Sequence, residues 1–203
     1  MKSLLKYFLI ATFVTTLIPL SSCKKGAHDP FLSLRSRTSR LSGDWKLTDQ
    51  KYTITQIAGT TTTVKEYTYD GTFVTVNTTI TFSGAPPQRS NNKYSYTSAW
   101  TFNKDNSFTN TDVESGVTTV KEGNWAFLGK DKSAGLKNKE AIIVNTEKTT
   151  QGASVSTSGK TDQGDTWVLD ELSNSKLIVT IDASDIPNPN NKTTIVGSKT
   201  YMK

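Results

Sequence analysis

The sequence predicts an all-β domain, an antiparallel up-and-down β-barrel of about eight to ten strands preceded by a short N-terminal helix. Two observations carry this prediction. From Gly43 onward, Thr, Val, Ile, Tyr and Phe alternate with polar residues at period two, and turn residues interrupt the pattern about every eight to twelve positions. Each of the four tryptophans also begins a Trp-x-apolar pair, and residues two apart on a strand share one face. These pairs, which direct large apolar side chains into one interior, are Trp45 with Leu47, Trp100 with Phe102, Trp125 with Phe127 and Trp167 with Leu169.

The first 22 residues have the pattern of a secretion signal. Lys2 and Lys6 precede an apolar stretch over 7–20, which is shorter than the roughly 20 apolar residues that span a bilayer. The stretch closes on Leu20-Ser21-Ser22-Cys23, which resembles the lipobox of bacterial lipoproteins. That resemblance implies cleavage before Cys23, acylation of its thiol with a fatty acid such as palmitate, and attachment to membrane lipid.

Cys23 is the only cysteine, so its acylation leaves no thiol for a disulfide, a metal site or a nucleophile. Removing residues 1–22 takes away two of the 24 basic residues and none of the 18 acidic ones, which leaves a net charge of +4 on 181 residues. That length suits one domain with a sizeable core. No basic run interleaved with aromatic residues indicates a nucleic-acid groove.

Residues 23–42 are predicted to be a lipidated linker that contains a short amphipathic helix. Asp29-Pro30 is a helix-start signal, and apolar residues recur at helical spacing up to the stop at Gly43. The opposite face carries Arg35, Arg37 and Arg40, which would either cap the end of the domain or rest on the membrane. A flexible stalk is the alternative.

The barrel domain is predicted to extend over 43–203, with short turns gathered at the anchored end and most long loops at the other. The predicted strands are 44–56, 61–69, 72–82, 93–103, 106–113, 117–128, 140–147, 165–173, 175–181 and 193–202. Tight turns are predicted at Asp70-Gly71, Lys104-Asp105 and Asn174-Ser175. The long loops are predicted at 83–92, 148–164 and 182–192, where binding sites over a rigid scaffold commonly lie.

The aromatic residues of the inward-facing pattern are the candidate ligand-binding residues. Tyr94, Tyr96 and Trp100 extend along one face of a single predicted strand, and Trp125 and Trp167 point into the same interior. These five residues either line a ligand cavity or pack as core, since aromatic stripes serve both purposes.

Catalytic chemistry is sparse in this sequence, and no catalytic residue, cofactor or metal site is predicted. His28 is the only histidine and lies five residues past Cys23, outside the barrel. Two acidic pairs, Asp162 with Asp165 and Asp182 with Asp185, have the spacing of ion or glycoside chemistry. For the second pair, a calcium site in the 182–190 loop is the alternative to a plain turn. We expect either Asp170 or Glu171 to point inward from its strand.

Several short motifs resemble those of lipocalins, and of the lipocalin-like lipoproteins of Gram-negative bacteria in particular, over residues 43–202. They are Gly43-Asp44-Trp45, Asn103-Lys104-Asp105-Asn106, Gly123-Asn124-Trp125 and Leu172-Ser173-Asn174-Ser175-Lys176-Leu177. The resemblance implies a lipocalin-like barrel whose closed end is marked by Gly43 and Trp45. Lipocalins pack a late arginine over that tryptophan, whereas the last arginine here is Arg89, so Lys199 or Lys203 would have to replace it.

The function expected from these observations is that of a monomeric, outer-membrane-anchored lipoprotein without enzymatic activity, whose barrel binds a small, partly apolar ligand at its open end. The expected location is the periplasmic side, with the cell surface as the alternative. The other function left open is a packed structural or interaction module of the cell envelope. Such a module would hold a protein or a glycan through the loops at 83–92 and 148–164.

Overall fold

The computed structural model describes residues 36–128, 140–158, 164–188 and 191–203, without the side chains of 184–188. In these segments the chain forms one short helix and eleven strands. They are α2 (Arg37–Leu41), β1 (Gly43–Ala58), β2 (Thr61–Tyr69), β3 (Phe73–Phe82), β4 (Gln88–Phe102), β5 (Ser107–Glu114), β6 (Val117–Leu128), β7 (Glu140–Gln151), β8 (Ser154–Thr157), β9 (Asp165–Leu172), β10 (Lys176–Asn188) and β11 (Asn191–Met202).

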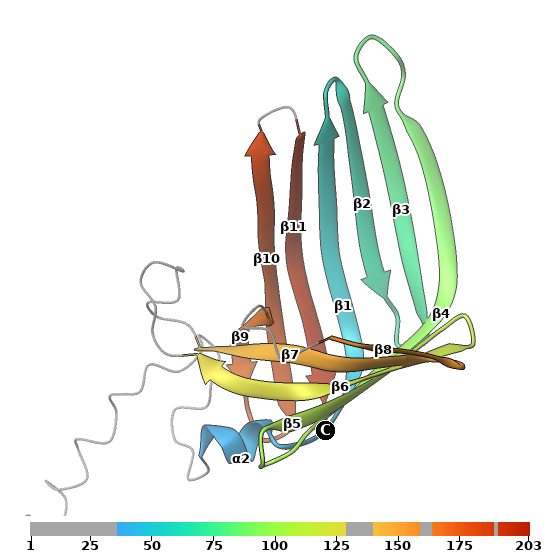
Figure 1. Cartoon of the computed structure of the whole chain (residues 1–203). Helices are drawn as coiled ribbons and strands as arrows, with labels where there is room; N and C mark the ends of the chain where they lie inside the picture. The colour runs from blue at the N-terminus through green and yellow to red at the C-terminus, as the bar shows by residue number, and fades with distance from the viewer. Residues whose placement is uncertain (1–35, 129–139, 159–163, 189–190) are drawn as a thin grey trace, which may run out of the picture.

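The strands close into an antiparallel barrel. Each strand from β1 to β7 pairs with the next one, β7 also pairs with β9, and β9, β10, β11 and β1 complete the ring. β8 lies outside the ring, because within the described residues it pairs only with β7. The barrel therefore has ten strands and one extra strand, which confirms the predicted all-β, up-and-down architecture (Figure 1).

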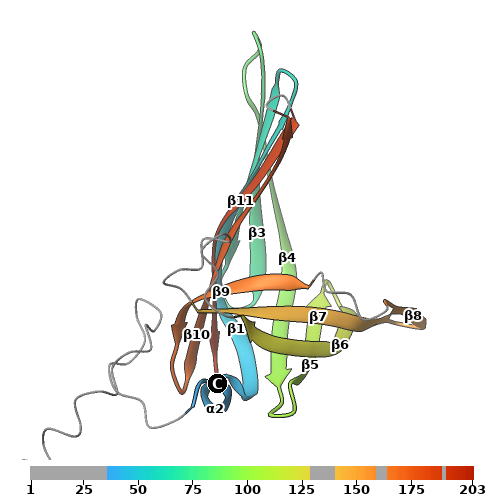
Figure 2. The same cartoon turned by 60° about the vertical axis from the view of Figure 1, so that its left-hand side comes forward.

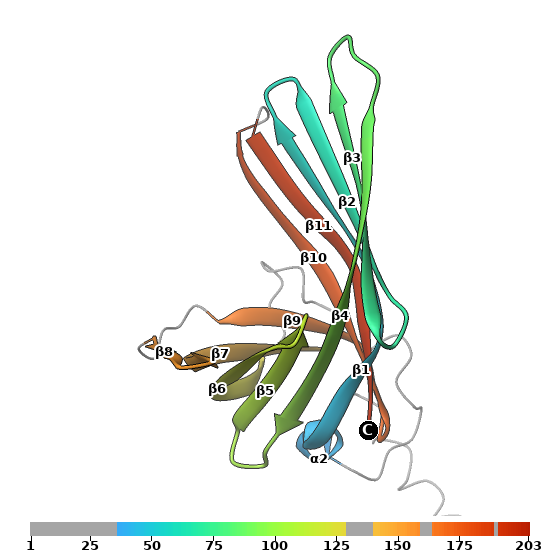
Figure 3. The same cartoon turned by 90° about the vertical axis from the view of Figure 1, so that its right-hand side faces the viewer.

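The barrel has two tiers, because β1 changes its partner along its length. Its first residues pair directly with the end of β4, with Trp45 opposite Trp100, whereas from Gln50 onward β1 pairs with β2. Below this point, where β2 and β3 are absent, eight of the ten strands form a short closed barrel, here called the lower barrel. Above it, β2, β3 and the adjoining parts of β10, β11, β1 and β4 rise as one sheet, here called the upper sheet (Figures 2 and 3).

The upper sheet is a single layer. No described helix or strand covers either of its faces in any of the three views (Figures 1, 2 and 3). Its sequence is rich in Thr, with isolated Val, Ile and Tyr, residues of high β-propensity that stabilise strands through cross-strand pairs. Phe82 and Val196 remain 37% and 52% exposed there. Tyr69, Val74 and Val76, near the turn between β2 and β3, are buried and join the hydrophobic core, whereas the rest of the upper sheet is held by its ladders.

The hydrophobic core fills the lower barrel. The paired pattern of the tryptophans is confirmed at Trp45 and Leu47, which are 0% and 5% exposed, and at Trp100 and Phe102, which are 9% and 1% exposed. Rings from different strands meet there, as where Trp125 contacts Phe102 edge-on at 5.9 Å. The other buried apolar residues at this level are Leu41, Phe108, Ala141, Ile142, Val144, Leu169, Leu172, Leu177, Val179 and Tyr201.

Helix α2 closes the base of the lower barrel (Figure 1). Ser36 caps it by accepting a hydrogen bond from the Ser39 backbone N–H, and Leu41 is fully buried. Arg40 is 3% exposed and donates to the Leu172 carbonyl at 2.6 Å, while Arg37 pairs with Glu140 at 3.0 Å. These two arginines therefore contact the domain; Arg35 and the earlier part of the predicted helix lie outside the described residues. None of the described helices is long and apolar enough to cross a membrane.

Three predicted loops turn out to contain strand. β4 begins at Gln88, inside the loop expected over 83–92, and β7 extends to Gln151 and is followed by β8 inside 148–164. β10 and β11 likewise extend through most of 182–192. These segments are rich in Ser, Thr, Asn and Pro, which indicate turns locally. Ladder pairing with neighbouring strands overrides that local preference.

Candidate functional site

The predicted aromatic residues divide between the core and the mouth of the lower barrel. Trp100 lies at the centre of a ring cluster, 4.5 Å from Trp167 and 5.2 Å from Phe108 between centroids. Trp125 is 2% exposed and donates from Nε1 to the Ser107 carbonyl at 3.1 Å. The structure therefore places Trp100 and Trp125 in the packed core. Tyr94, Tyr96 and Trp167 are half-buried and pack against the edge of that core.

Gly43 and Trp45 lie at the closed base. The indole of Trp45 is fully buried and donates from Nε1 to the Leu41 carbonyl at 2.6 Å. Lys203 lies over it, with Nζ 4.6 Å from the ring centroid and hydrogen bonds to the Arg40 and Ser42 carbonyls at 2.6 and 2.8 Å. Lys203 is thus the cation that covers the opening tryptophan, whereas Lys199 lies elsewhere.

A cleft of about 440 Å³ opens where β9 separates from β10; we call it the fork cleft. The two strands are paired as far as Thr180 opposite Val168, after which β9 continues along β7 and β10 continues into the upper sheet. The rings of Trp167 and Tyr201 are nearly parallel in its wall, with centroids 6.2 Å apart. The residues that line the cleft are Asp165, Thr166, Trp167, Val168, Val179, Thr180, Ile181, Asp182, Ala183, Lys199 and Tyr201.

Two stacked tyrosines, Tyr52 of β1 and Tyr67 of β2, lie near Lys199 of the fork cleft. Tyr52 and Tyr67 stack at 4.4 Å between centroids. Tyr52 lies across Gly197 of β11, and a Cβ at position 197 would collide with the Cα and Cβ of Tyr52. Glycine at 197 thus permits this close approach. Burial raises the pKa of Tyr52, and also that of Tyr201, above the usual range, so both phenols stay neutral in the physiological range.

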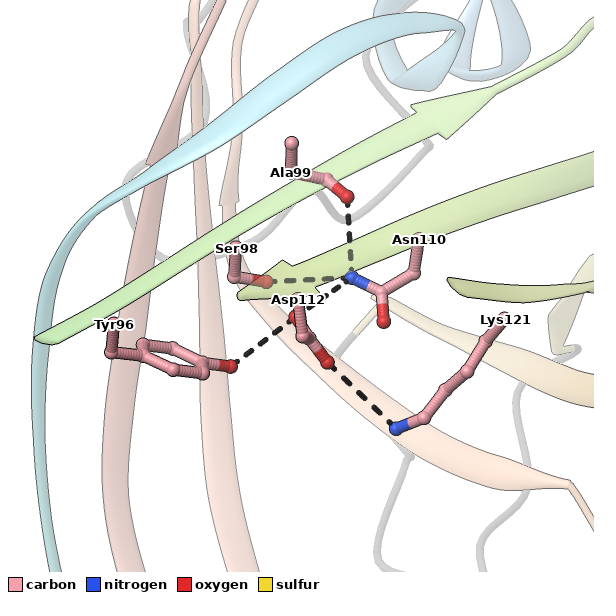
Figure 4. Close-up of polar contacts among 6 residues, drawn as sticks. All are labelled: Tyr96, Ser98, Ala99, Asn110, Asp112 and Lys121. Atoms are coloured by element: carbon pink, nitrogen blue, oxygen red, sulfur yellow. Dashed lines mark hydrogen bonds and ion pairs between the residues drawn. The ribbon is translucent and has the colours of Figure 1, made fainter. Parts of the chain in front are cut away.

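A polar cluster centred on Asp112 of β5 joins side chains from β4, β5 and β6 (Figure 4). Its carboxylate accepts from the Tyr96 hydroxyl at 3.3 Å and from Asn110 Nδ2 at 3.1 Å, and it lies 3.9 Å from Lys121 Nζ. Asn110 is fully buried, and its Nδ2 also donates to the Ala99 carbonyl at 3.2 Å. Burial and the Asp112 charge raise the pKa of Tyr96. Three side chains therefore already contact the Asp112 carboxylate, and one of them, Lys121, carries the opposite charge.

Of the charged residues that line the fork cleft, Lys199 is the most buried, since Asp165 and Asp182 are exposed. It lies on β11 between Gln50 of β1 and Val179 of β10, both of which are buried. Its Nζ is 5.9 Å from the centroid of the Tyr52 ring. Burial lowers the pKa of Lys199; Asp112 opposes this change and Lys121 adds to it. No carboxylate in the described part of the chain forms an ion pair with Lys199.

The predicted carboxylate pairs are only partly within the described structure. Asp165 lines the fork cleft, as does Asp182, and both are exposed, whereas Asp162 and the side chain of Asp185 lie outside the description. The described residues contain no group of three or more His, Cys, Asp or Glu that would hold a metal ion. Cys23 and His28 also lie outside the described residues.

The expectation that Asp170 or Glu171 points into the core is wrong. A bulge in the pairing of β9 with β10, between Ile178 and Val179, breaks the alternation. As a result Leu169 and Leu172 are both buried, at 1% and 0%, and the two acidic residues between them are not. Glu171 pairs instead with Lys176 at 2.9 Å.

Sequence reasoning named Lys199 only as a possible cover for Trp45 and did not assign it to a binding site. A signal for its inward position was nevertheless present, because Lys199 lies two residues before the buried Tyr201 on the same strand. The burial of Gln50 had no such signal. A bulge between Leu47 and Asp49 moves it onto the face of Leu47, three positions away.

Comparisons with models of protein families, with curated proteins and with solved structures found no match to this chain.

Proposed function

We propose that this chain is a lipid-anchored envelope protein that binds a small, partly apolar ligand in the fork cleft. One observation carries the proposal: an open cleft of about 440 Å³ whose wall combines the rings of Trp167 and Tyr201 with the side chain of Lys199. Small-molecule sites have volumes of about 300–1,000 Å³ and combine apolar walls with a few polar groups. The fork cleft meets both criteria.

The ligand site lies at the mouth of the lower barrel rather than deep inside it. Trp100, Phe102 and Phe108 occupy the interior below the cleft and are at most 9% exposed. Their rings contact one another at 5.2–6.4 Å between centroids, so they serve as packing. Trp167 is half-buried and lines the cleft, and we therefore propose it as the main aromatic contact for the ligand.

In this proposal the anchor and the ligand site lie at opposite ends of the domain. Acylation of Cys23 would tether the chain to the outer membrane through residues 24–35, which lead into α2 at the base. The upper sheet lies on the other side of the lower barrel from α2 (Figures 1 and 2). The fork cleft opens where β10 leaves β9 and continues into that sheet. A ligand would then enter from the aqueous side, which we propose is the periplasm.

Titration of the mature chain with the neutral apolar probe phenylnaphthylamine tests the proposal. We expect saturable binding that raises probe fluorescence, and a loss of about tenfold in affinity for Trp167→Ala, since a buried aromatic contact contributes on the order of 1–2 kcal/mol. Phe82→Ala is the matched control, because it removes an exposed ring at the far end of the upper sheet. Equal affinity in Trp167→Ala and Phe82→Ala would place the site elsewhere, and absence of binding would refute the proposal.

A second candidate function, an interaction module, is favoured by the two free edges of the upper sheet. Residues 88–94 of β4 have a partner only on the β3 side, and β10 from Ile181 onward has one only on the β11 side, within the described residues. Free strand edges are templates for strand addition by a partner. Lys93 beside Asp70 at 3.2 Å places charge at the first edge, which discourages promiscuous pairing.

In-cell crosslinking tests this second candidate function. A cysteine introduced at Asn92 on the free edge of β4 should crosslink to an envelope protein, whereas one at Thr78 on β3, inside the sheet, should not. Both positions point to the same face, because Val76 pairs with Asn92 and Thr78 lies two residues from Val76. If the two variants give the same crosslinks, the edge is not the binding element.

A further inference from the structure

The fork cleft contains a lysine whose charge the described protein does not neutralise. Lys199 lies between the buried residues Gln50 and Val179, and its side chain reaches the cleft wall. The nearest acidic group of the interior, Asp112, already interacts with Tyr96, Asn110 and Lys121. The charges that act on Lys199 from inside are this carboxylate and the ammonium group of Lys121, which oppose each other. A half-buried cation with unused hydrogen-bonding capacity favours a negative group from outside.

The groups that surround Lys199 fit an apolar body attached to that negative group. Tyr201 and Trp167 form one wall, and Val179 and Ile181 form the adjoining one. Tyr52 lies on β1, which pairs with β11, and its ring centroid is 5.9 Å from Lys199 Nζ. Flat apolar groups stack on such rings and lose water on doing so. The cation and the apolar walls are adjacent, so one small amphipathic molecule would contact both.

The rim of the cleft limits how much negative charge the ligand carries. Asp165 of β9 and Asp182 of β10 line the cleft and are exposed to solvent. Neither forms an ion pair with a described residue, so both present their charge at the entrance. A ligand with a second anionic group near its outer end would be repelled by them.

We propose that the ligand of the fork cleft is a monoanionic amphipath whose negative group pairs with Lys199 while its apolar body packs against Trp167 and Tyr201. This inference rests on the proposed function, since it names the chemical class of the ligand at the same site. Lys199 acts in it as the specificity-determining residue. The aromatic walls supply affinity for any apolar molecule, and Lys199 selects the negatively charged ones.

Two probes that share one scaffold separate this inference from the proposed function. Anilinonaphthalene sulfonate and phenylnaphthylamine have the same aromatic body, and only the first carries a negative group. The protein for this test is the mature chain, residues 23–203, with Cys23→Ser so that no detergent is needed. We expect the sulfonate to bind about tenfold more tightly than phenylnaphthylamine, which is the contribution of one charge-assisted contact. Equal affinities would refute the inference and leave the proposed function standing, whereas binding of neither probe would refute both.

Variants of Lys199 test the residue itself. Lys199→Met, which keeps the volume and removes the charge, should lower sulfonate affinity about tenfold and leave the neutral probe unchanged. Lys199→Arg should restore most of the preference. Lys51→Met is the matched control, since it removes an exposed lysine from the outer face of β1. Unchanged sulfonate affinity in Lys199→Met would overturn the inference.

A pH titration of the unsubstituted site provides a test that needs no variant. Burial lowers the pKa of Lys199, so its charge is lost, and sulfonate affinity falls, at a lower pH than the usual lysine value of about 10.4. The charged groups that face Lys199 are Asp112 and Lys121, with Asp165 and Asp182 at the rim, while Tyr52 and Tyr201 have raised pKa values and stay neutral. If the sulfonate affinity stays constant as the pH rises to about 10.4, as that of the neutral probe should, the inference is overturned.

Discussion

Replacing Trp45 by alanine should be among the most destabilising single substitutions in this domain. The indole is fully buried between the strands of the lower barrel and helix α2. Truncating a buried tryptophan costs about 3–5 kcal/mol. The substitution also leaves the buried Leu41 carbonyl without its donor, which costs about 1–3 kcal/mol. These two effects overlap, so we expect the free energy of unfolding to fall by about 4–6 kcal/mol, a large part of a total of about 5–15 kcal/mol.

Urea unfolding followed by circular dichroism measures this loss without relying on tryptophan fluorescence. With a urea dependence of about 2 kcal/mol per molar, the midpoint should fall by about 2–3 M. Trp45→Phe keeps a six-membered ring in the core but loses the rest of the indole with its N–H donor, so its midpoint should fall by less, about 0.5–1.5 M. Lys203→Met removes the cation over the ring, worth about 0.5–1 kcal/mol, and should shift the midpoint by no more than about 0.5 M.

The outcome that contradicts this reasoning is a Trp45→Ala midpoint within about 0.5 M of the parent. Such a result would mean that the base of the barrel is not packed around this ring. It would also remove the reason for assigning α2 a closing role.

Three further predictions concern the boundary of the domain, its anchor and the approach of β1 to β11. Deleting residues 1–35 should leave the urea midpoint of the mature chain unchanged. Deleting residues 1–42 should lower the free energy of unfolding by about 2–5 kcal/mol, because it removes the fully buried Leu41. Equal midpoints for the two deletions would show that α2 contributes no stability. Cys23→Ala should release the chain from the membrane fraction or leave it uncut, and normal processing with retention on the membrane would disprove the anchor. Gly197→Ala should cost about 1–3 kcal/mol because the new Cβ meets Tyr52, while the outward Ser198→Ala should cost little; similar melts for both would disprove the close approach.

Much of the fold followed from local sequence pattern. Alternation at period two identified the strands from Gly43 onward, and the Trp-x-apolar pairs identified which face is buried, because a strand places every second side chain on the same side. The turns at Asp70-Gly71 and Asn174-Ser175 were also recognisable, because short polar side chains bond the backbone there: Asp70 accepts from the Thr72 and Phe73 N–H groups.

Features that depend on long-range pairing were not predictable from local pattern. Segments 83–92, 148–164 and 182–192 have turn-like composition, yet they extend strands because neighbouring strands supply hydrogen-bond partners. Bulges at Leu47/Asp49 and Ile178/Val179 shift the alternation, which buries Gln50 and keeps Asp170 and Glu171 out of the core.

Residue type and near-neighbour spacing were enough to predict the all-β class, the candidate anchor at Cys23 and the burial of Trp45. They were not enough to show that Trp100 is core, that Lys203 covers Trp45 or that Lys199 lies in the fork cleft. These features depend on contacts between residues far apart in the chain, because such contacts close a barrel. The place of the cleft depends on two changes of strand pairing: β1 changes its partner from β4 to β2, and β9 separates from β10. No local stretch of sequence records either change.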